Sequence, residues 1–371
     1  MKYKTITSLA ACAFFTHAQH ASAQSSVTIY GVLSAGFAYS PNASGQRMLE
    51  ADSGQNQNPR WGLRGEEDLG GGTKAIFTLE NGFNIYTGTA AQNGRLFGRQ
   101  GFMGLTNTTW GTLTMGRQYD SVVDYLGPNT GAAWYASIGD SDNTWNDLRI
   151  QNSVKYSTPE VHGFKAEALY GFSNAGSFND NSAFSFGAGY KNGPFSWNAA
   201  YAEYKNPNSA DNTNGAISND YAGTYLLFTH SGTAAQAAAT EQRIMGTGVL
   251  DSIGQLRLGA MFTNVRFTYL DASHLTLNNF QVSANYNIRQ NFVVGAGYVF
   301  TRGRYDDPNT KPMWHELNVV ADYYLSKDTD ISIMSYAQLA TGDARHATVL
   351  GFATASGKRQ LVITTGIKHR F

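Results

Sequence analysis

The chain has 371 residues, in which 27 lysines and arginines are balanced by 27 aspartates and glutamates. Nucleic-acid-binding proteins usually carry a marked basic excess, so this balance argues against a nucleic-acid partner. After residue 23 no run of about 18 apolar residues occurs, which excludes a membrane-spanning helix. The mean hydropathy of −0.32 suits a soluble protein. It suits a transmembrane β-barrel equally well, because half of each barrel strand faces water.

The first 23 residues contain the three parts of a secretory signal. Lys2 and Lys4 form the positive region, residues 6–15 form the apolar core, and residues 21–23 (ASA) form a small-residue cleavage site. We expect residues 1–23 to be removed and residues 24–371 to form the mature protein. The single cysteine, Cys12, would leave with the signal, so no disulfide is expected. The alternative is a lipoprotein signal read at residues 9–12 (LAAC), which would have a very short apolar core.

Alternating apolar and polar residues recur along the mature chain, as in β-strands with two different faces. In one segment Phe280 and Val282 oppose Gln281 and Ser283. We count sixteen such segments, of which the tenth, residues 242–250, is the least regular. A soluble β-sandwich would also alternate. However, aromatic residues gather near the segment ends, and charged residues occupy the opposite faces. Both features favour a sixteen-stranded antiparallel transmembrane barrel.

The connections between these segments alternate between short turns and long loops, as in outer-membrane barrels. The long ones cover residues 41–59, 119–148, 206–240, 304–313 and 341–358. The region 206–240 contains an apolar insert, residues 225–228, with no assigned role. The loop within residues 117–149 has no sustained helical or strand periodicity and carries five aspartates. Loops of this length are usually functional or disordered, and we expect this one to fold into the barrel and narrow a pore.

Several motifs occur in one order along the whole mature chain. They lie at residues 26–31 (SVTIYG), 60–70 (RWGLRGEEDLG), 74–80 (KAIFTLE), 111–119 (GTLTMGRQY), 152–159 (NSVKYSTP) and 366–371 (GIKHRF). With these motifs the chain resembles the general diffusion porins of Gram-negative bacteria, most closely the β-proteobacterial type. The resemblance implies a homotrimer in the outer membrane with its third external loop inside the barrel. It also implies that Phe371 serves as a C-terminal assembly signal.

The resemblance implies passive diffusion of small hydrophilic solutes and ions, with selectivity set by charges at the narrowest point. The alternation of side chains along a strand (parity) places Arg60 and Arg64 on the inner face, because Trp61 and Leu63 would face lipid. Arg99 would also point inward if Phe102 faces lipid. Arg117 shares the parity of the lipid-facing residues Leu113 and Met115, unless Gly116 bends or bulges the strand. The resemblance nevertheless places three arginines in a basic wall: Arg60, Arg117 and Arg149.

Loop carboxylates would face this wall, the candidates being Asp120, Asp124, Asp140 and Asp142. Each aspartate could instead cap a turn, and each arginine could form a structural salt bridge within the barrel. Because the basic candidates outnumber any one acidic cluster, we expect weak anion preference.

Two other functions fit the sequence less well. An enzyme is disfavoured because the histidines are scattered, and the adjacent pair His315 and Glu316 would point to opposite faces of one strand. No cofactor or metal is expected. A substrate-specific channel is the stronger alternative, because Trp134, Tyr135 and Trp145 could begin an aromatic track for sugars. External acids such as Asp306 and Asp307 could bridge calcium or lipopolysaccharide, which would add outer-membrane lipid to the partners.

Overall fold

The computed structural model describes residues 25–54, 57–130, 138–207, 209–217, 239–307 and 309–371. Four sequence predictions concern segments outside these residues: the signal 1–23, the aromatic pair Trp134 and Tyr135, the insert 225–228, and most of the region 206–240.

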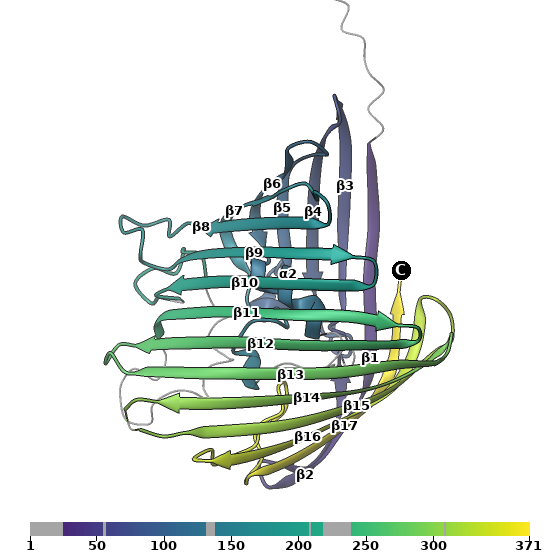
Figure 1. The fold of residues 1–371 in the computed structure, drawn as a ribbon, viewed down its shortest axis with the longest axis vertical. Helices are drawn as coiled ribbons and strands as arrows, with labels where there is room; N and C mark the ends of the chain where they lie inside the picture. Colours follow the sequence, from purple (N-terminus) through teal and green to yellow (C-terminus); the bar gives the residue numbers. More distant parts are fainter. Residues whose placement is uncertain (1–24, 55–56, 131–137, 208, 218–238, 308) are drawn as a thin grey trace, which may run out of the picture.

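Antiparallel strands form one closed sheet (Figure 1). They are β1 (Ser26–Ala43), β2 (Gln46–Ser53), β3 (Arg60–Gly70), β4 (Thr73–Gly82), β5 (Gln100–Asn107), β6 (Gly111–Gln118), β7 (Ile150–Ser157), β8 (Phe164–Gly171), β9 (Ser182–Asn192), β10 (Phe195–Lys205), β11 (Ala239–Ile253), β12 (Leu256–Tyr269), β13 (His274–Arg289), β14 (Phe292–Tyr305), β15 (Pro312–Tyr324), β16 (Thr329–Gly342) and β17 (Arg359–Arg370). The short helical elements are α1 (Ala91–Gly94), α2 (Ser121–Thr130) and the 3₁₀ turn η1 (Ile138–Asp140).

The first strand pairs with three others and closes the barrel. Its first half pairs with β3 and its second half with β2, so β2, which ends at Ser53, and β3, which begins at Arg60, together occupy the place of one strand. On its other edge β1 pairs with β17. The backbone N–H and C=O of Phe371 both bond to Gly31, at 3.2 and 3.0 Å. The barrel therefore has sixteen strands, as the alternation predicts.

Two segments differ from the sequence expectation. Residues 41–59 do not form a simple long loop, because β1 continues to Ala43 and β2 returns after a two-residue turn. Ser44 and Gly45 make this turn with positive φ angles of 52° and 88°. The tenth segment, which looked weak, is the fifteen-residue strand β11.

The two faces of the barrel wall differ in polarity. On β13 the outward side chains are apolar and exposed, with Phe280 at 47% and Val282 at 54%, while the inward Asn279 and Gln281 are buried. Likewise His315 lies among outward aromatic rings and Glu316 is buried on the inner face, as parity predicts. Apolar residues outside and polar residues inside are what a barrel in lipid requires. Among the described residues no helix is long and apolar enough to cross a bilayer.

Candidate functional site

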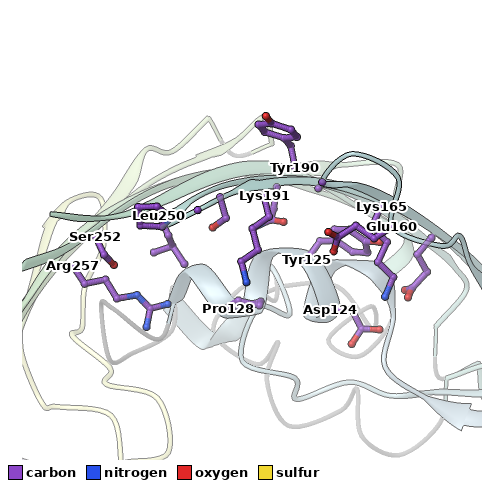
Figure 2. Close-up of a pocket in the computed structure, with 17 residues that line it drawn as sticks. Asp124, Tyr125, Pro128, Glu160, Lys165, Tyr190, Lys191, Leu250, Ser252 and Arg257 are labelled. Carbon is purple, nitrogen blue, oxygen red and sulfur yellow. The ribbon is translucent and has the colours of Figure 1, made fainter. Parts of the chain in front are cut away.

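Helix α2 corrects the expectation that residues 119–148 lack helical periodicity. Its buried side chains Val122, Tyr125, Leu126 and Asn129 follow the i, i+3, i+4, i+7 spacing of one helix face. Asp120 caps its N-terminus, because Oδ1 accepts a 3.0 Å hydrogen bond from the N–H of Val123. The helix packs on the concave side of the curved sheet, against β9 to β12 (Figure 2).

Glycines on the inner face of the strands allow the helix to lie close to the sheet. A Cβ at Gly187 would come within 2.4 Å of the Tyr125 ring, and one at Gly246 within 2.7 Å of Leu126. Gly189 and Gly248 stand two positions further along the same faces, next to Tyr125 and Asn129. Side chains at these positions would push α2 away from the wall.

Two buried carboxylates tie the segment 119–149 to distant strands. Asp120 accepts hydrogen bonds from Asn143 (2.9 Å) and from the hydroxyl of Tyr204 on β10. Asp142 accepts hydrogen bonds from Thr263 on β12 (2.5 Å) and Asn279 on β13 (3.2 Å). Burial raises the pKa of Asp120, and its hydrogen bonds act in the opposite direction. Both carboxylates hold the segment against the wall.

The other two acidic candidates have different surroundings. Asp140 is buried and accepts hydrogen bonds from the N–H groups of Trp145 (3.0 Å) and Asp147 (3.2 Å). Burial, followed by the negative charges of Asp147 and Asp142, raises its pKa well above the usual range. Asp124 is exposed and forms an ion pair with Lys155 at 2.5 Å. Of the four candidates, only Asp124 presents an exposed carboxylate.

Glu80 on β4 forms ion pairs with two arginines of the predicted basic wall, Arg60 and Arg99. Arg99 donates through Nε to Glu80 Oε1 at 2.7 Å, and the Nε of Arg60 lies 3.8 Å from Oε2. Arg99 also donates to the hydroxyl of Tyr119 at 2.7 Å. Arg64 is exposed, and its guanidinium lies 4.8 Å from the centroid of the Tyr30 ring. Arg60 and Arg99 are thus brought together, with Arg64 further along β3.

The expected reason for the position of Arg99 was wrong. Phe102 pairs with Thr78, whose side chain shares the buried inner face of Glu80, while the neighbouring Met103 is 66% exposed. Phe102 therefore does not face lipid. Arg99 itself precedes β5, so strand parity does not determine its direction.

Arg117 and Arg149 are buried, and both donate hydrogen bonds to backbone carbonyls. Arg117 donates to the carbonyls of Gly98 (2.7 Å) and Arg149 (3.3 Å). The pairing of β6 with β7 shifts register after Gly116, whose φ is 138°, so the anticipated irregularity is present at this position. Arg149 donates to the Asp147 carbonyl at 2.9 Å and lies over the Tyr119 ring.

A cavity of about 590 Å³ lies between the predicted basic wall and the end of the segment 119–149. Arg60, Arg99 and Glu80 line one side, and Tyr119 with residues 145–147 lines another. Arg64, Arg117 and Arg149 are not among its lining residues, nor are the four candidate aspartates. The loop carboxylate beside the basic wall is therefore Asp147, which sequence reasoning did not select.

A second cavity, of about 820 Å³, lies between α2 and the short turns (Figure 2). Lys165, Lys191 and Arg257 line it, together with Asp124 and the carboxylates of Glu160 and Glu167. Figure 2 shows Lys191 pointing toward α2, whereas the adjacent Tyr190 points away on the convex side. In the described ranges no three His, Cys, Asp or Glu side chains are arranged to hold a metal ion.

The site also contains Glu80, Tyr204 and Asn143, and the sequence indicated the position of only the first. Phe77 and Leu79 share one face of their strand and Glu80 lies on the other, so alternation predicts that Glu80 points inward. Its role as the partner of two arginines could not be predicted, because Arg60 and Arg99 are 20 and 19 positions away on either side. Tyr204 and Asn143 gave no signal of their contact with Asp120.

Comparison with known proteins agrees with this architecture. The family model of Gram-negative porins matches residues 7–347. An outer membrane porin protein of Bordetella pertussis is 31% identical over 99% of this chain and 100% of the relative. Outer membrane porin protein 32 of Delftia acidovorans is 25% identical over 98% and 99% of the two chains.

Solved structures share the fold. An anion-selective porin from Comamonas acidovorans superposes with a TM-score of 0.75 at 21% identity, covering 94% of this chain and 100% of the other. The trimer form of OmpT from Vibrio cholerae gives a TM-score of 0.69 at 13% identity, covering 94% and 99%. The chain belongs to the Gram-negative porin family, whose members are channel proteins of the outer membrane and not enzymes.

Proposed function

We propose that the protein is a passive diffusion channel for small hydrophilic solutes and ions, and that the segment 119–149 narrows it. The observation that carries this proposal is the seating of α2 on the concave side of the wall. There, glycines leave room for the helix, and Asp120 and Asp142 bond to strands β10, β12 and β13. A segment held this firmly inside a closed barrel reduces its open cross-section.

We further propose weak anion preference. Asp120, Asp140 and Asp142 are buried and hydrogen-bonded, so passing ions cannot contact their carboxylates directly. Glu80 is neutralised by Arg99 and Arg60. By contrast, Arg64, Lys165, Lys191 and Arg257 form no ion pair with any carboxylate in the described part of the chain. The structural neighbour from Comamonas acidovorans is an anion-selective porin, which agrees with this sign.

The test is the reversal potential of single channels in a planar bilayer across a KCl gradient. The native channel is expected to give the sign that indicates chloride preference. The variant Lys165→Gln/Lys191→Gln/Arg257→Gln removes three unpaired inward cations and is expected to shift the potential toward cation preference. The matched control is Arg266→Gln/Arg302→Gln/Arg304→Gln, which removes the same charge from the outer face. Equal potentials in all three proteins would contradict the proposal.

A substitution of Arg60 tests separately whether the basic wall contributes to ion selectivity. Arg60→Gln leaves Arg99 bonded to Glu80, so the local fold is kept while one cation lining the 590 Å³ cavity is lost. We expect a smaller shift toward cations and a slightly altered conductance. An unchanged potential would place ion selection elsewhere in the channel.

We also propose a homotrimer, supported by the trimeric OmpT neighbour. Its test is the mass of the native complex in detergent. Stepwise conductance that appears in groups of three would agree, whereas a monomeric mass with full conductance would contradict it.

A substrate-specific channel remains the second candidate because aromatic side chains line the 590 Å³ cavity. Tyr119, Trp145, Tyr336 and Phe352 stand there beside charged groups, as in a site for a sugar or an organic acid. Block of the ohmic current by one solute class at low concentration would favour this candidate. Current that no sugar or organic acid reduces would favour general diffusion.

A further inference from the structure

Four charged side chains meet on β15, β16 and β17, close to the end of the barrel where the chain terminates (Figure 1). Asp330 on β16 is the register partner of Lys368 on β17 and, on its other side, of Tyr324 on β15. Asp322 precedes Tyr324 by two residues, so the two aspartates are diagonal neighbours on one face of the sheet. Because β17 closes the barrel against β1, we call this set the seam cluster; it comprises Asp322, Asp330, Lys368 and Arg370.

The seam cluster lies on the inner face of the barrel wall. The residues next to the two aspartates along their strands, Tyr323 and Ile331, are large and are each 43% exposed on the outer face. Since side chains alternate along a strand, the aspartates point inward. Asp322 and Asp330 are both 0% exposed, and Lys368 is 3% exposed. Both carboxyl groups are therefore enclosed by protein.

The positive charges of the cluster are directed at only one of the two aspartates. Nζ of Lys368 lies 3.2 Å from Oδ2 of Asp330, and Nη1 of Arg370 lies 3.7 Å from the same atom. In the described part of the chain Asp322 forms no ion pair, and neither of its oxygens accepts a hydrogen bond. An enclosed, ionised carboxylate without a partner is strongly unfavourable.

The missing partner of Asp322 is the other carboxyl group. The side chains of Asp322 and Asp330 lie within hydrogen-bonding reach of each other. Two ionised carboxylates can only accept hydrogen bonds, so a contact between them is repulsive. One proton converts it into a short, strong O–H···O⁻ hydrogen bond, and carboxylates that share a site retain one proton for this reason. We propose that Asp322 and Asp330 share one proton and so form a proton-binding site on the inner face of the barrel.

The other groups packed around the pair supply no further charge. Val293 on β14 and Ser332 on β16 are register partners of Asp322, and Ser34 on β1 is the register partner of the lysine. None of these three side chains titrates. The Tyr324 hydroxyl also faces the pair, and a tyrosine is neutral below about pH 10. The shared proton is therefore the group that changes the charge of the cluster near neutral pH.

The proton determines the net charge of the seam cluster. With the proton bound, the aspartate pair carries one negative charge against the two positive charges of Lys368 and Arg370, so the cluster is positive. When the pH rises and the proton leaves to solvent, the cluster becomes neutral. The anion preference of the channel should then weaken. This last consequence rests on the function proposed above, whereas the proton site itself does not.

The test is infrared difference spectroscopy of the full protein in detergent at about pH 7. A neutral carboxyl group has a carbonyl stretch that ionised carboxylates lack. We expect Asp322→Asn and Asp330→Asn each to remove one neutral-carboxyl band, because a shared proton needs both groups. The matched control, Asp307→Asn, changes an exposed aspartate and should remove none. The amide band in the same spectra verifies that each variant retains its β structure.

Three results would overturn the proposal. If neither variant loses a band, both carboxylates are ionised in the native protein. If only Asp322→Asn loses it, the proton belongs to that residue alone and is not shared. A band that appears in the native protein only after treatment with a chelator would place a metal ion between the carboxylates.

A second measurement separates the proton site from the proposed ion selectivity. The reversal potential of the native channel across a KCl gradient should move away from anion preference as the pH rises, and that of Asp322→Asn should move less. If both variants lose the infrared band while the native potential does not respond to pH, the proton site is confirmed and its effect on selectivity is refuted.

Discussion

The two halves of the segment 119–149 use similar residues for different purposes. The first half, from Asp120 through α2, buries its apolar face against inward glycines and uses carboxylates as hydrogen-bond acceptors for the wall. The last part contributes residues 145–147 to the lining of a cavity opposite Arg60 and Arg99. We call these the anchor half and the cavity half. Residues 140–143 belong with the anchor half, since Asp142 and Asn143 bond to strand residues and to Asp120.

If the segment narrows a channel as proposed, this difference means that the charge of a loop residue is a poor guide to its role. A buried, hydrogen-bonded carboxylate stabilises a conformation through its donors, and passing ions cannot approach it closely. A carboxylate at the wall of a water-filled cavity acts on passing ions. If the division is correct, substitutions in the anchor half should change stability most, and substitutions in the cavity half should change selectivity most.

The largest effect is expected for Asp120→Ala. It removes the N-cap of α2 and the carboxylate that accepts hydrogen bonds from the buried Tyr204 hydroxyl and Asn143 amide. We expect a loss of about 2–4 kcal/mol in the free energy of unfolding, together with larger open-channel current fluctuations. Urea unfolding and single-channel recording measure the two effects. The control is Asp124→Ala on the exposed side of the same helix, which should cost less than about 1 kcal/mol.

Gly187→Ala is expected to have the next largest effect. Its Cβ would lie 2.4 Å from Cδ2 of Tyr125, so either the helix or the strand must move. Overpacking of this kind costs about 1–3 kcal/mol. Gly176→Ala, which meets nothing within 4 Å, should be nearly neutral. If the steric account is right, Gly187→Ala should cost less in a Tyr125→Ala background. An equal cost in both backgrounds would show that α2 is not seated as described.

The barrel itself could be predicted from the sequence because strand alternation is local. Phe280 and Gln281 reveal two faces whatever the rest of the chain does. The same local reasoning failed at the interruption of the second strand, where β1 and β2 continue through residues expected to be a loop. It also failed at Arg117, where the register shift beside Gly116 makes parity an unsafe guide.

The anchor half could be predicted only in part. The spacing of Val122, Tyr125 and Leu126 after Asp120 is a helix signal that is present in the sequence. The partners of the aspartates could not be predicted, because Asp142 and Thr263 are 121 positions apart. Burial of a loop carboxylate depends on which strands enclose it, and alternation gives no information about that.

The variant Asp147→Asn tests whether the cavity half, and not the anchor half, sets the ion selectivity. Asp147 lines the cavity beside Arg60 and Arg99, so its neutralisation should increase anion preference in the reversal potential. The contrasting variant is Asp142→Asn in the anchor half. That carboxylate is buried against Thr263 and Asn279, so the change should lower stability and leave the potential unaltered. The reverse pattern would exchange the roles assigned to the two parts.

The smallest effect concerns the pH dependence of the junction between the halves. Asp140 has a folded-state pKa well above its unfolded value, through burial and then the charges of Asp147 and Asp142. The folded state therefore binds this proton more tightly. The resulting contribution to stability is fully present below the unfolded pKa and is lost as the pH rises through the folded pKa.

Asp140→Asn keeps an oxygen to accept from the Trp145 N–H, but it has no proton to lose in this range. The variant should match the native protein at low pH and become relatively more stable toward neutral pH. Urea unfolding from about pH 4 to about pH 8 measures the difference. A difference that is constant with pH would mean that Asp140 titrates alike in the folded and unfolded states. In that case burial would not disfavour its ionised form, and the assignment of Asp140 to the anchor half would fail.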